Sequence, residues 1–163
     1  MIFIGIDPGL SGAIAAVTTN GHAAVWDMQT ILKGYGSVKS EVNAAALFAC
    51  LNRLVNNEDR DVAVAALERV NSMPGQAASS TFSLGDSFGV ARACLACAAV
   101  PTQYVTPQTW KKHFGLSKEK EEARSLAIKL YPTVELHLKK YVDRAEALLI
   151  ATWLKEKYNA CSI

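Results

Sequence analysis

The chain has 163 residues, of which 50% are hydrophobic, and a formal net charge of +2 from 17 basic and 15 acidic residues. No apolar run reaches the roughly 18 to 20 residues of a membrane span, so the composition excludes a membrane-spanning protein and predicts one domain over residues 1–163. The small net charge does not by itself indicate nucleic-acid binding, although residues 101–163, with 11 basic and 7 acidic side chains, hold the basic surplus.

The first half of the sequence predicts strands followed by a helix and a further strand. Residues 41–55 have apolar positions near helical spacing, and Ser40 is the expected N-cap of this helix. A polar loop with Pro and Gly is expected at 71–78. Short apolar runs bounded by turn residues predict strands at 2–7, 13–18, 23–28 and 61–68.

The second half predicts four helices and one strand. Residues 79–99 are expected to be helical despite Gly85 and Gly89, whose missing side chains permit close approach of another backbone, including that of a second subunit. Ser117 is the expected N-cap of a charged helix that ends before Pro132. The other elements are a strand at 103–105, a short helix from Pro107 and a last helix at 143–158. The alternation predicts a mixed α/β fold.

Two apolar strands end in an acidic residue. The run at 2–7 ends in Asp7, and the run at 61–68 ends in Glu68. A bare carboxylate is costly to remove from water, and parallel neighbours would bring both acids to one edge of the sheet, where open α/β folds bind ligands. Two simpler interpretations remain open: Asp7 as the first residue of an Asp-Pro-Gly turn, and Glu68 as a strand-end acid that reaches solvent.

Two further acids begin the last predicted helix. Asp143 and Glu146 are three residues apart and share a helix face with the apolar residues Ala147, Ile150 and Leu154, so both acids are expected to face the core. The alternative is a capping role, because Asp-x-x-Glu at a helix start also satisfies free backbone amides.

Together, two strand-end acids and two inward-facing acids would form one oxygen-rich cluster. Mutual repulsion would destabilise such a cluster unless cations occupied it. Hard divalent ions such as Mg²⁺ or Mn²⁺ fit carboxylate oxygens, and two ions about 3.5 to 4 Å apart assist an in-line displacement at phosphorus. The cluster therefore favours metal-dependent phosphoryl chemistry.

The ordered motifs resemble those of the RuvC family of Holliday-junction resolvases, in its phage-type and chloroplast branches. IGIDPG at 4–9 looks like the first family motif, ALERV at 66–70 like the second and DRAEALLIA at 143–151 like the third. SLGDSFGVARA at 83–93 resembles the glycine-containing helix, and the segment at 107–123 resembles the basic stretch.

This resemblance implies a ribonuclease-H-like fold, with a five-stranded mixed sheet and helices on both faces. It also implies a homodimeric endonuclease of DNA recombination and repair that binds four-way junctions and nicks two like strands, leaving 5′-phosphate and 3′-hydroxyl ends. Each active site would hold two Mg²⁺ or Mn²⁺ ions. Asp7 would bridge the two metals, Glu68 and Asp143 would complete their ligands, and Glu146 would bind a metal or orient the water. A cytoplasmic or nucleoid-associated location would follow.

Two positions depart from the family pattern. The fourth acid is Glu146 where many relatives have Asp, which moves the carboxylate one methylene outward. Asn71 stands where bacterial relatives carry an aromatic residue that stacks on junction bases. Opening of the junction centre would then depend on other DNA contacts, for which Met73, Pro74 and Phe82 are candidates.

Basic residues gather on both sides of the expected loop near residue 115. They predict a surface that binds DNA phosphates, with Trp110 beside it. The alternative is a solvated helix face on which the neighbouring glutamates pair with the lysines. In the family this region holds functional lysines; Lys120 matches one of them, and Lys111 and Lys112 compete for the other. The predicted phosphate contacts are Lys111, Lys112, Lys118, Lys120 and Arg124.

Three rival functions use parts of the same pattern. A different nuclease or a transposase on this fold would keep the acids and cut other branched or duplex DNA. An actin-like ATPase or sugar kinase also has a G-I-D-x-G phosphate loop, but it needs two such lobes. A non-catalytic DNA-binding module would have no reason to keep all four acids.

Overall fold

A central sheet of five strands organises the protein. The structure is a computed structural model that describes residues 1–34, 40–56, 62–71 and 75–160. The strand order is β3-β2-β1-β6-β7, in which β1, β2 and β3 form an antiparallel meander and β6 and β7 run parallel to β1. The strands are β1 (Ile2–Asp7), β2 (Ala13–Thr18), β3 (Ala23–Asp27), β6 (Ala63–Glu68) and β7 (Thr102–Val105).

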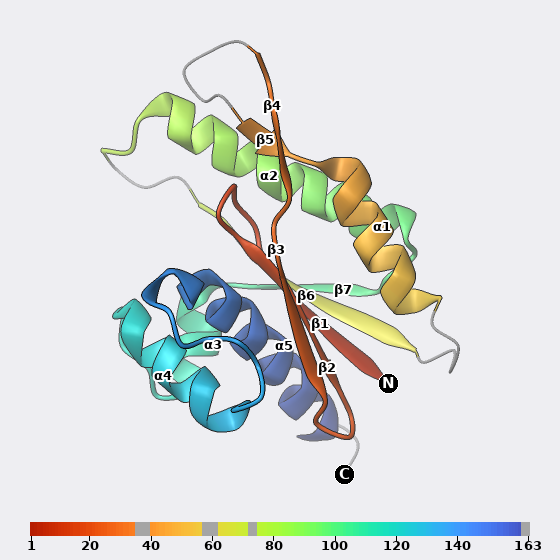
Figure 1. The fold of residues 1–163 in the computed structure, drawn as a ribbon, viewed down its shortest axis with the longest axis vertical. Coiled ribbons are helices and arrows are strands. Elements are labelled where there is room, and N and C mark those ends of the chain that lie inside the picture. Colours follow the sequence, from red (N-terminus) through yellow and green to blue (C-terminus); the bar gives the residue numbers. More distant parts are fainter. Residues whose placement is uncertain (35–39, 57–61, 72–74, 161–163) are drawn as a thin grey trace.

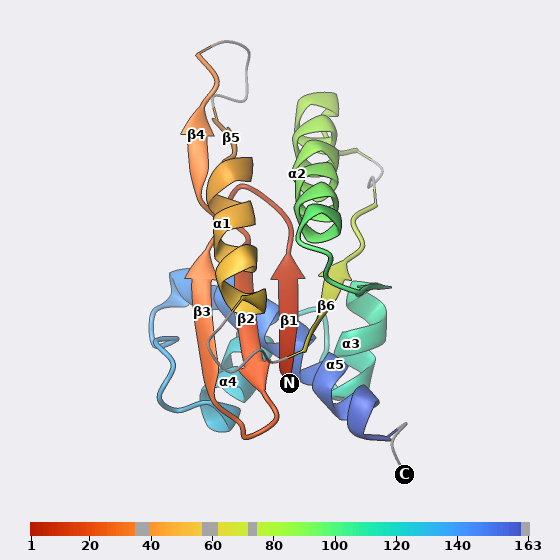
Figure 2. The ribbon, with the colours of Figure 1, turned by 90° about the vertical axis from the view of Figure 1, so that its right-hand side faces the viewer.

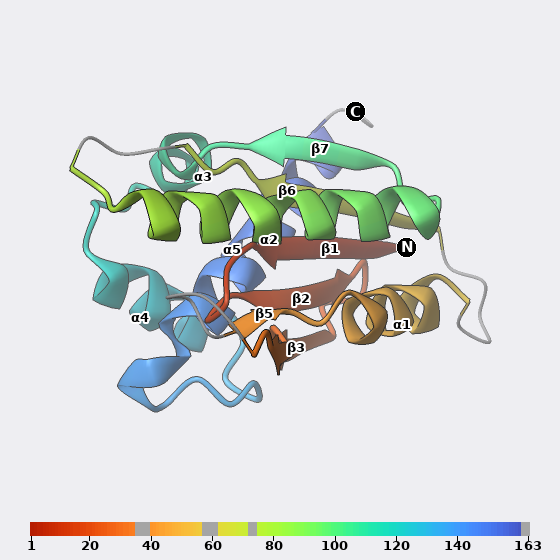
Figure 3. The ribbon, with the colours of Figure 1, turned by 90° about the horizontal axis from the view of Figure 1, so that it is seen from above.

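Helices cover both faces of this sheet (Figure 1). Helices α1 (Ala44–Val55) and α2 (Ala78–Cys97) lie on one face, and Figure 3 shows α2 running along the sheet above β1 and β6. The other face carries α3 (Pro107–His113), α4 (Lys120–Leu130) and α5 (Val142–Ala160), with the 3-10 turn η1 (Lys139–Tyr141) directly before α5. The predicted five-stranded mixed sheet with helices on both faces is thereby confirmed.

The central strand β1 is apolar on both sides, which makes two cores. Ile4 and Ile6 pack under α1 and α2, whereas Phe3 packs against the layer of α5. Gly5 also faces α5, and a Cβ added to it would lie 2.1 Å from the carbonyl oxygen of Ala147. Helix α5 therefore lies directly on the backbone of β1, which fixes the position of the start of α5 relative to the end of β1.

A small second sheet was not predicted from the sequence. Strands β4 (Thr30–Leu32) and β5 (Ser40–Val42) pair antiparallel and extend past the ends of the main strands (Figures 1 and 2). Lys33 lies 3.5 Å from Glu41 and 3.9 Å from Asp86, which joins this hairpin to α2.

Two predicted N-caps are wrong. Ser40 belongs to β5, and the N-cap of α1 is Asn43, whose side chain accepts a hydrogen bond of 3.1 Å from the amide of Ala46. Helix α4 begins at Lys120, so Ser117 lies before the cap position; its hydroxyl accepts from the amide of Glu119 at 3.1 Å. None of the helices that the structure describes is long and apolar enough to cross a lipid bilayer.

Candidate active site

Asp7 and Glu68 lie at the same edge of the sheet. Strands β1 and β6 pair in parallel, with Ile6 opposite Leu67, so the next residue of each strand is the acid. The expectation that these strands are parallel neighbours is confirmed. Both strands are buried up to their last residue, and Asp7 and Glu68 themselves are half-buried.

The start of α5 brings two more acids to this edge. Carboxylate oxygens of Asp7, Asp143 and Glu146 all lie within 4.8 Å of one another. Glu146 is 7% exposed although it is charged. In the described part of the chain, neither Asp143 nor Glu146 accepts a hydrogen bond from a backbone amide, so the capping interpretation finds no support. These three residues are called the acidic triad below.

Glu68 lies beside the acidic triad and is held by a different partner. The indole N–H of Trp110 donates a hydrogen bond of 2.7 Å to Oε1 of Glu68. Trp110 is fully buried on α3, a helix that begins with Pro107 and is capped by the hydroxyl of Thr106. Glu68 therefore has one oxygen bound to Trp110, while its other oxygen accepts no hydrogen bond within the described residues.

Two lysines bind the acids from α3 and α4. Lys111 Nζ lies 2.8 Å from Oε1 of Glu146. Lys120 Nζ lies 3.1 Å from Oδ1 of Asp143 and 3.9 Å from Oε2 of Glu146. These ammonium groups partly compensate the repulsion among the carboxylates, and they place positive charge beside the acidic triad.

Burial and mutual repulsion shift the titration of this site. Burial raises the pKa of Asp7 well above its ordinary value, and the charges of Glu68, Glu146 and Asp143 raise it further, against a lowering by Lys120. Burial also raises the pKa of Glu68, although the hydrogen bond from Trp110 opposes this. For Lys120, burial acts to lower the pKa, but the hydrogen bond and charge of Asp143 together with the charges of Glu146 and Asp7 outweigh burial and raise it. The site as it stands thus carries more negative charge than its lysines offset.

A cavity of about 590 Å³ contains all four acids. One wall is the turn after β1, from Pro8 to Gly12, and the opposite wall is the first half of α2 with Ser80, Ser83 and Leu84. Lys111 and Lys120 complete the lining. Clustered carboxylate oxygens in an open, polar cavity are ligands suited to hard divalent cations, so the residues present fit a Mg²⁺ or Mn²⁺ site.

Two of the other predicted DNA contacts, Arg124 and Lys112, do not line the cavity of the acids. Arg124 is ion-paired with Glu121 and donates to the backbone carbonyls of Leu136 and His137 at 2.8 and 3.0 Å, so it braces the loop after α4. Lys112 lines a separate cavity with His113 and Trp153, away from the acids.

The remaining candidate DNA contacts either lie at the protein surface or fall outside the residues that the structure describes. Lys118 and Asn71 are exposed, and Phe82 is 72% exposed on α2. Met73 and Pro74 lie outside the residues that the structure describes. Trp110 was predicted to lie beside a phosphate-binding surface, but it is buried and contacts Glu68, a role that its spacing in the sequence does not reveal.

Comparison with known proteins identifies the fold. No protein-family model matches the sequence, and no curated protein matches it. A solved structure of Thermus thermophilus RuvC in complex with a Holliday junction substrate superposes with a TM-score of 0.64 at 18% identity, over 99% of this chain and 96% of that chain. A second Thermus thermophilus RuvC structure gives a TM-score of 0.56 with the same identity and coverage. The chain has a RuvC-like, ribonuclease-H-type fold.

Proposed function

We propose that this protein is a metal-dependent endonuclease that resolves four-way DNA junctions, with the whole chain acting as one nuclease domain. The observation that carries the proposal is the convergence of Asp7, Glu68, Asp143 and Glu146 from two parallel strands and one helix onto a single cavity. The RuvC-like fold supports the choice of substrate, because one of the similar structures is a complex with a Holliday junction. The ordered sequence motifs support the same choice.

The acidic triad and Glu68 would hold two Mg²⁺ ions, with Mn²⁺ as the alternative. The charges of all three other acids act on Asp7, which suits a ligand that both ions would share, while Asp143 and Glu146 would complete one site and Glu68 the other. When bound, such ions ready a water molecule and offset the charge that develops on the phosphodiester.

The side chains around the acids would orient a metal ligand and bind the phosphates of the substrate. Trp110 holds Glu68 in one orientation, which removes the entropy of fixing that carboxylate when a ligand binds. Lys111 and Lys120 would exchange their carboxylate partners for phosphate oxygens of the bound strand. An attack in line with the 3′ oxygen as leaving group would give the 5′-phosphate and 3′-hydroxyl ends.

A homodimer would place two such sites on one junction. Gly85 and Gly89 lie on α2 with no other atom of the described chain within 4 Å of an added Cβ. The close backbone approach that these glycines permit is therefore not made by the described residues of the subunit, so this part of α2 would be available for a partner. Phe82 on the same helix and Asn71 after β6 are both exposed, and the neighbours of Phe82 on α2, Ser80 and Ser83, line the cavity of the acids. We therefore include both residues as DNA contacts, with Phe82 as the residue that opens the junction centre.

The test is cleavage of three DNAs by the purified protein. A four-way junction, a linear duplex of the same sequence and a flap are incubated with Mg²⁺ or with Mn²⁺. We expect paired nicks on the junction and little cutting of the other two DNAs. Equal cutting of all three would favour a less selective nuclease or a transposase of the same fold, and no cutting of any DNA with either ion would refute the proposal.

A further inference from the structure

A second, smaller cavity adjoins the candidate active site. Its volume is about 190 Å³, and it shares Leu10, Ser11, Gly12 and Asp143 with the larger cavity. Its remaining lining comes from the end of β3 and from η1, including Asp27, Lys140 and Tyr141. Asp143 therefore lines both cavities, the larger one with the other acids and the smaller one with Lys140.

The charge of this smaller cavity is dominated by Lys140. Asp27 is already neutralised by Arg144, whose Nε and Nη2 donate to its two carboxylate oxygens at 2.5 and 2.7 Å. Asp143 is bound by Lys120. Lys140 is exposed and forms no ion pair within the described residues, although its charge, after that of Arg144, helps to lower the pKa of Asp27. A positive charge without a direct acidic partner is available to an incoming anion.

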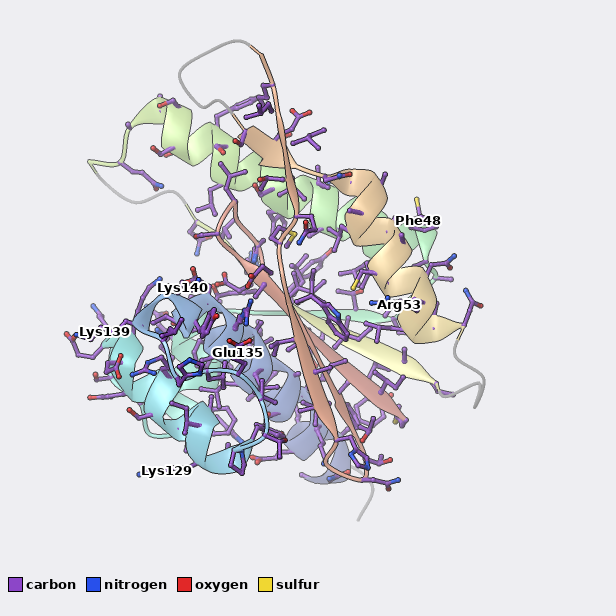
Figure 4. All side chains as sticks on the ribbon, in the orientation of Figure 1. Phe48, Arg53, Lys129, Glu135, Lys139 and Lys140 are labelled. Carbon is purple, nitrogen blue, oxygen red and sulfur yellow. The ribbon has the colours of Figure 1, made fainter. Side chains whose placement is uncertain are left out.

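The position of Lys140 is fixed relative to the acids. It lies on η1, which continues directly into α5, so Lys140 comes three positions before Asp143 on one continuous helical segment. The neighbouring Tyr141 anchors that segment, because its ring is buried beneath the guanidinium of Arg144 at 4.0 Å and its hydroxyl donates to Glu135 at 3.1 Å. Figure 4 shows Lys139 and Lys140 at the end of the lower layer where α5 begins, with Lys129 toward the opposite end.

A DNA strand that presents one phosphate to the acids must place its neighbouring phosphates on either side of them. Lys111 and Lys120 approach the acidic triad from α3 and α4. Lys140 approaches Asp143 from the other cavity. Lys111 and Lys120 thus line one cavity and Lys140 the neighbouring one, with Asp143 in the lining of both, an arrangement that suits contacts to successive phosphates of one strand.

We propose that the smaller cavity binds a phosphate next to the scissile phosphodiester, through the ammonium group of Lys140 with the hydroxyl of Ser11 as a second donor. This inference rests on the proposed nuclease function and extends the DNA path past the acids to η1. None of the lysines and arginines named above from sequence patterns lies in this position.

The experiment measures the affinity of a fluorescent four-way junction for the wild-type chain, Lys140→Ala and Lys129→Ala across a series of salt concentrations, in EDTA so that no cleavage occurs. Lys129 is a matched control, because it is an exposed lysine in the last turn of α4 and lines neither cavity. Loss of one phosphate contact reduces the slope of log affinity against log salt by about 0.7 to 0.9. We expect that reduction, with several-fold weaker binding, for Lys140→Ala, no change for Lys129→Ala, and recovery in Lys140→Arg.

The outcomes separate this inference from the proposed function. A Lys140→Ala chain that binds the junction with the slope and affinity of wild type would overturn the inference while leaving the nuclease proposal intact. A wild-type chain that binds no DNA would overturn both. Thermal unfolding of Lys140→Ala close to that of wild type excludes a structural cause, and the charge-preserving Lys140→Arg variant gives the same check if the alanine variant unfolds more easily.

Discussion

Asp7 is the residue on which the electrostatics of the site converge. Burial of its carboxylate raises the pKa of Asp7 well above the ordinary value of 3.8, and the charges of the three other acids raise it further. At pH values between 3.8, the pKa of Asp7 in the unfolded chain, and its raised pKa in the folded chain, the folded chain binds more protons than the unfolded chain. Without a bound cation, the free energy of unfolding contributed by Asp7 therefore falls as the pH rises through that range.

Replacement of Asp7 by Asn tests this balance. At neutral pH in EDTA we expect Asp7→Asn to be more stable than wild type by at least about 1 kcal/mol, which corresponds to a rise of about 2 to 4 °C in Tm. In wild type, Mg²⁺ at about 100 times its Kd should add about 2.7 kcal/mol. The variant should lose most of that increase. Thermal unfolding with and without Mg²⁺ measures both effects, and a less stable Asp7→Asn chain in EDTA would contradict this account.

Trp110 acts on the site through Glu68. A buried hydrogen bond to a charged acceptor contributes more than one between neutral groups, and loss of a residue that orients a metal ligand typically lowers metal affinity 10- to 100-fold. The 2.7 Å contact between the indole and Oε1 would make Trp110 a positioning residue for Glu68 as the proposed metal ligand.

Trp110→Phe keeps an aromatic ring but removes the N–H donor. We expect junction cleavage by this variant to need about 10-fold more Mg²⁺ for half-maximal rate, and we expect weaker Mn²⁺ binding by calorimetry. Trp153→Phe is the control, because it also shortens a buried tryptophan but lies outside the cavity of the acids. Equal metal dependence in the two variants would mean that Trp110 contributes only packing.

At the scale of single residues, the sequence predicted the four acids but not the side chains that contact them. Asp7 and Glu68 could be found because a charge at the end of an apolar strand is conspicuous. The contacts of Trp110, Lys111 and Arg124 depend on how α3 and α4 dock on the sheet, and that docking leaves no local pattern. For the same reason, the sequence could not separate Lys111 from Lys112, which point to different cavities.

At the scale of elements, the contact between β1 and α5 determines the geometry of the site. Gly5 leaves no space for a side chain, since a Cβ there would lie 2.1 Å from Ala147 O and 2.4 Å from the amide nitrogen of Ala151. The clash is with helix backbone, which cannot rotate away as a side chain can. Any displacement of α5 also moves Asp143 and Glu146.

Gly5→Ala should therefore lower the free energy of unfolding by far more than the addition of one carbon usually does. We expect a loss of about 3 kcal/mol or more in the free energy of unfolding, at the upper end of the costs of overpacking a core. Ile4→Val changes the neighbouring residue of the same strand by one carbon and should cost only about 0.5 to 1.5 kcal/mol. Urea denaturation compares the two variants; a Gly5→Ala cost no larger than that of Ile4→Val would show that α5 adjusts freely.

The long, apolar or strongly periodic elements were predictable, and the short ones were not. Strands β1, β2 and β6 and the last helix carry their own pattern over six or more residues. The β4 and β5 strands have three residues each, and β4 is exposed, so neither has a hydrophobic alternation to detect. The end of β3 at Asp27 and the N-cap of α4 at Glu119 each fall one or two residues from the predicted positions, because local patterns specify the ends of elements only weakly.

On the scale of the whole molecule, the four acids line a cavity at one edge of the sheet, beside the first half of α2. Gly85 and Gly89 leave a strip of that helix without side chains, and nothing in the described subunit packs there. A second copy of the chain that packs against this strip would bring two active sites onto a single junction, as paired nicking requires.

The dimer is tested by adding bulk to that strip. We expect wild type to sediment as a dimer and the double variant Gly85→Leu with Gly89→Leu to sediment as a monomer. Ala45→Leu, at an exposed position of α1 on the same face of the sheet, should leave the dimer intact. Analytical ultracentrifugation gives the mass directly, and a wild-type monomer at working concentrations would contradict this arrangement.

The most direct measurement of the central claim is nicking of a four-way junction in Mg²⁺ by wild type and by Asp7→Asn, Glu68→Gln, Asp143→Asn and Glu146→Gln. Each substitution removes one charge while keeping the size of the side chain. The account predicts that every variant still binds the junction but that nicking falls by at least about 100-fold, because each of the four carboxylates would be a ligand of the proposed pair of metal ions. Full nicking activity in Asp7→Asn would contradict it.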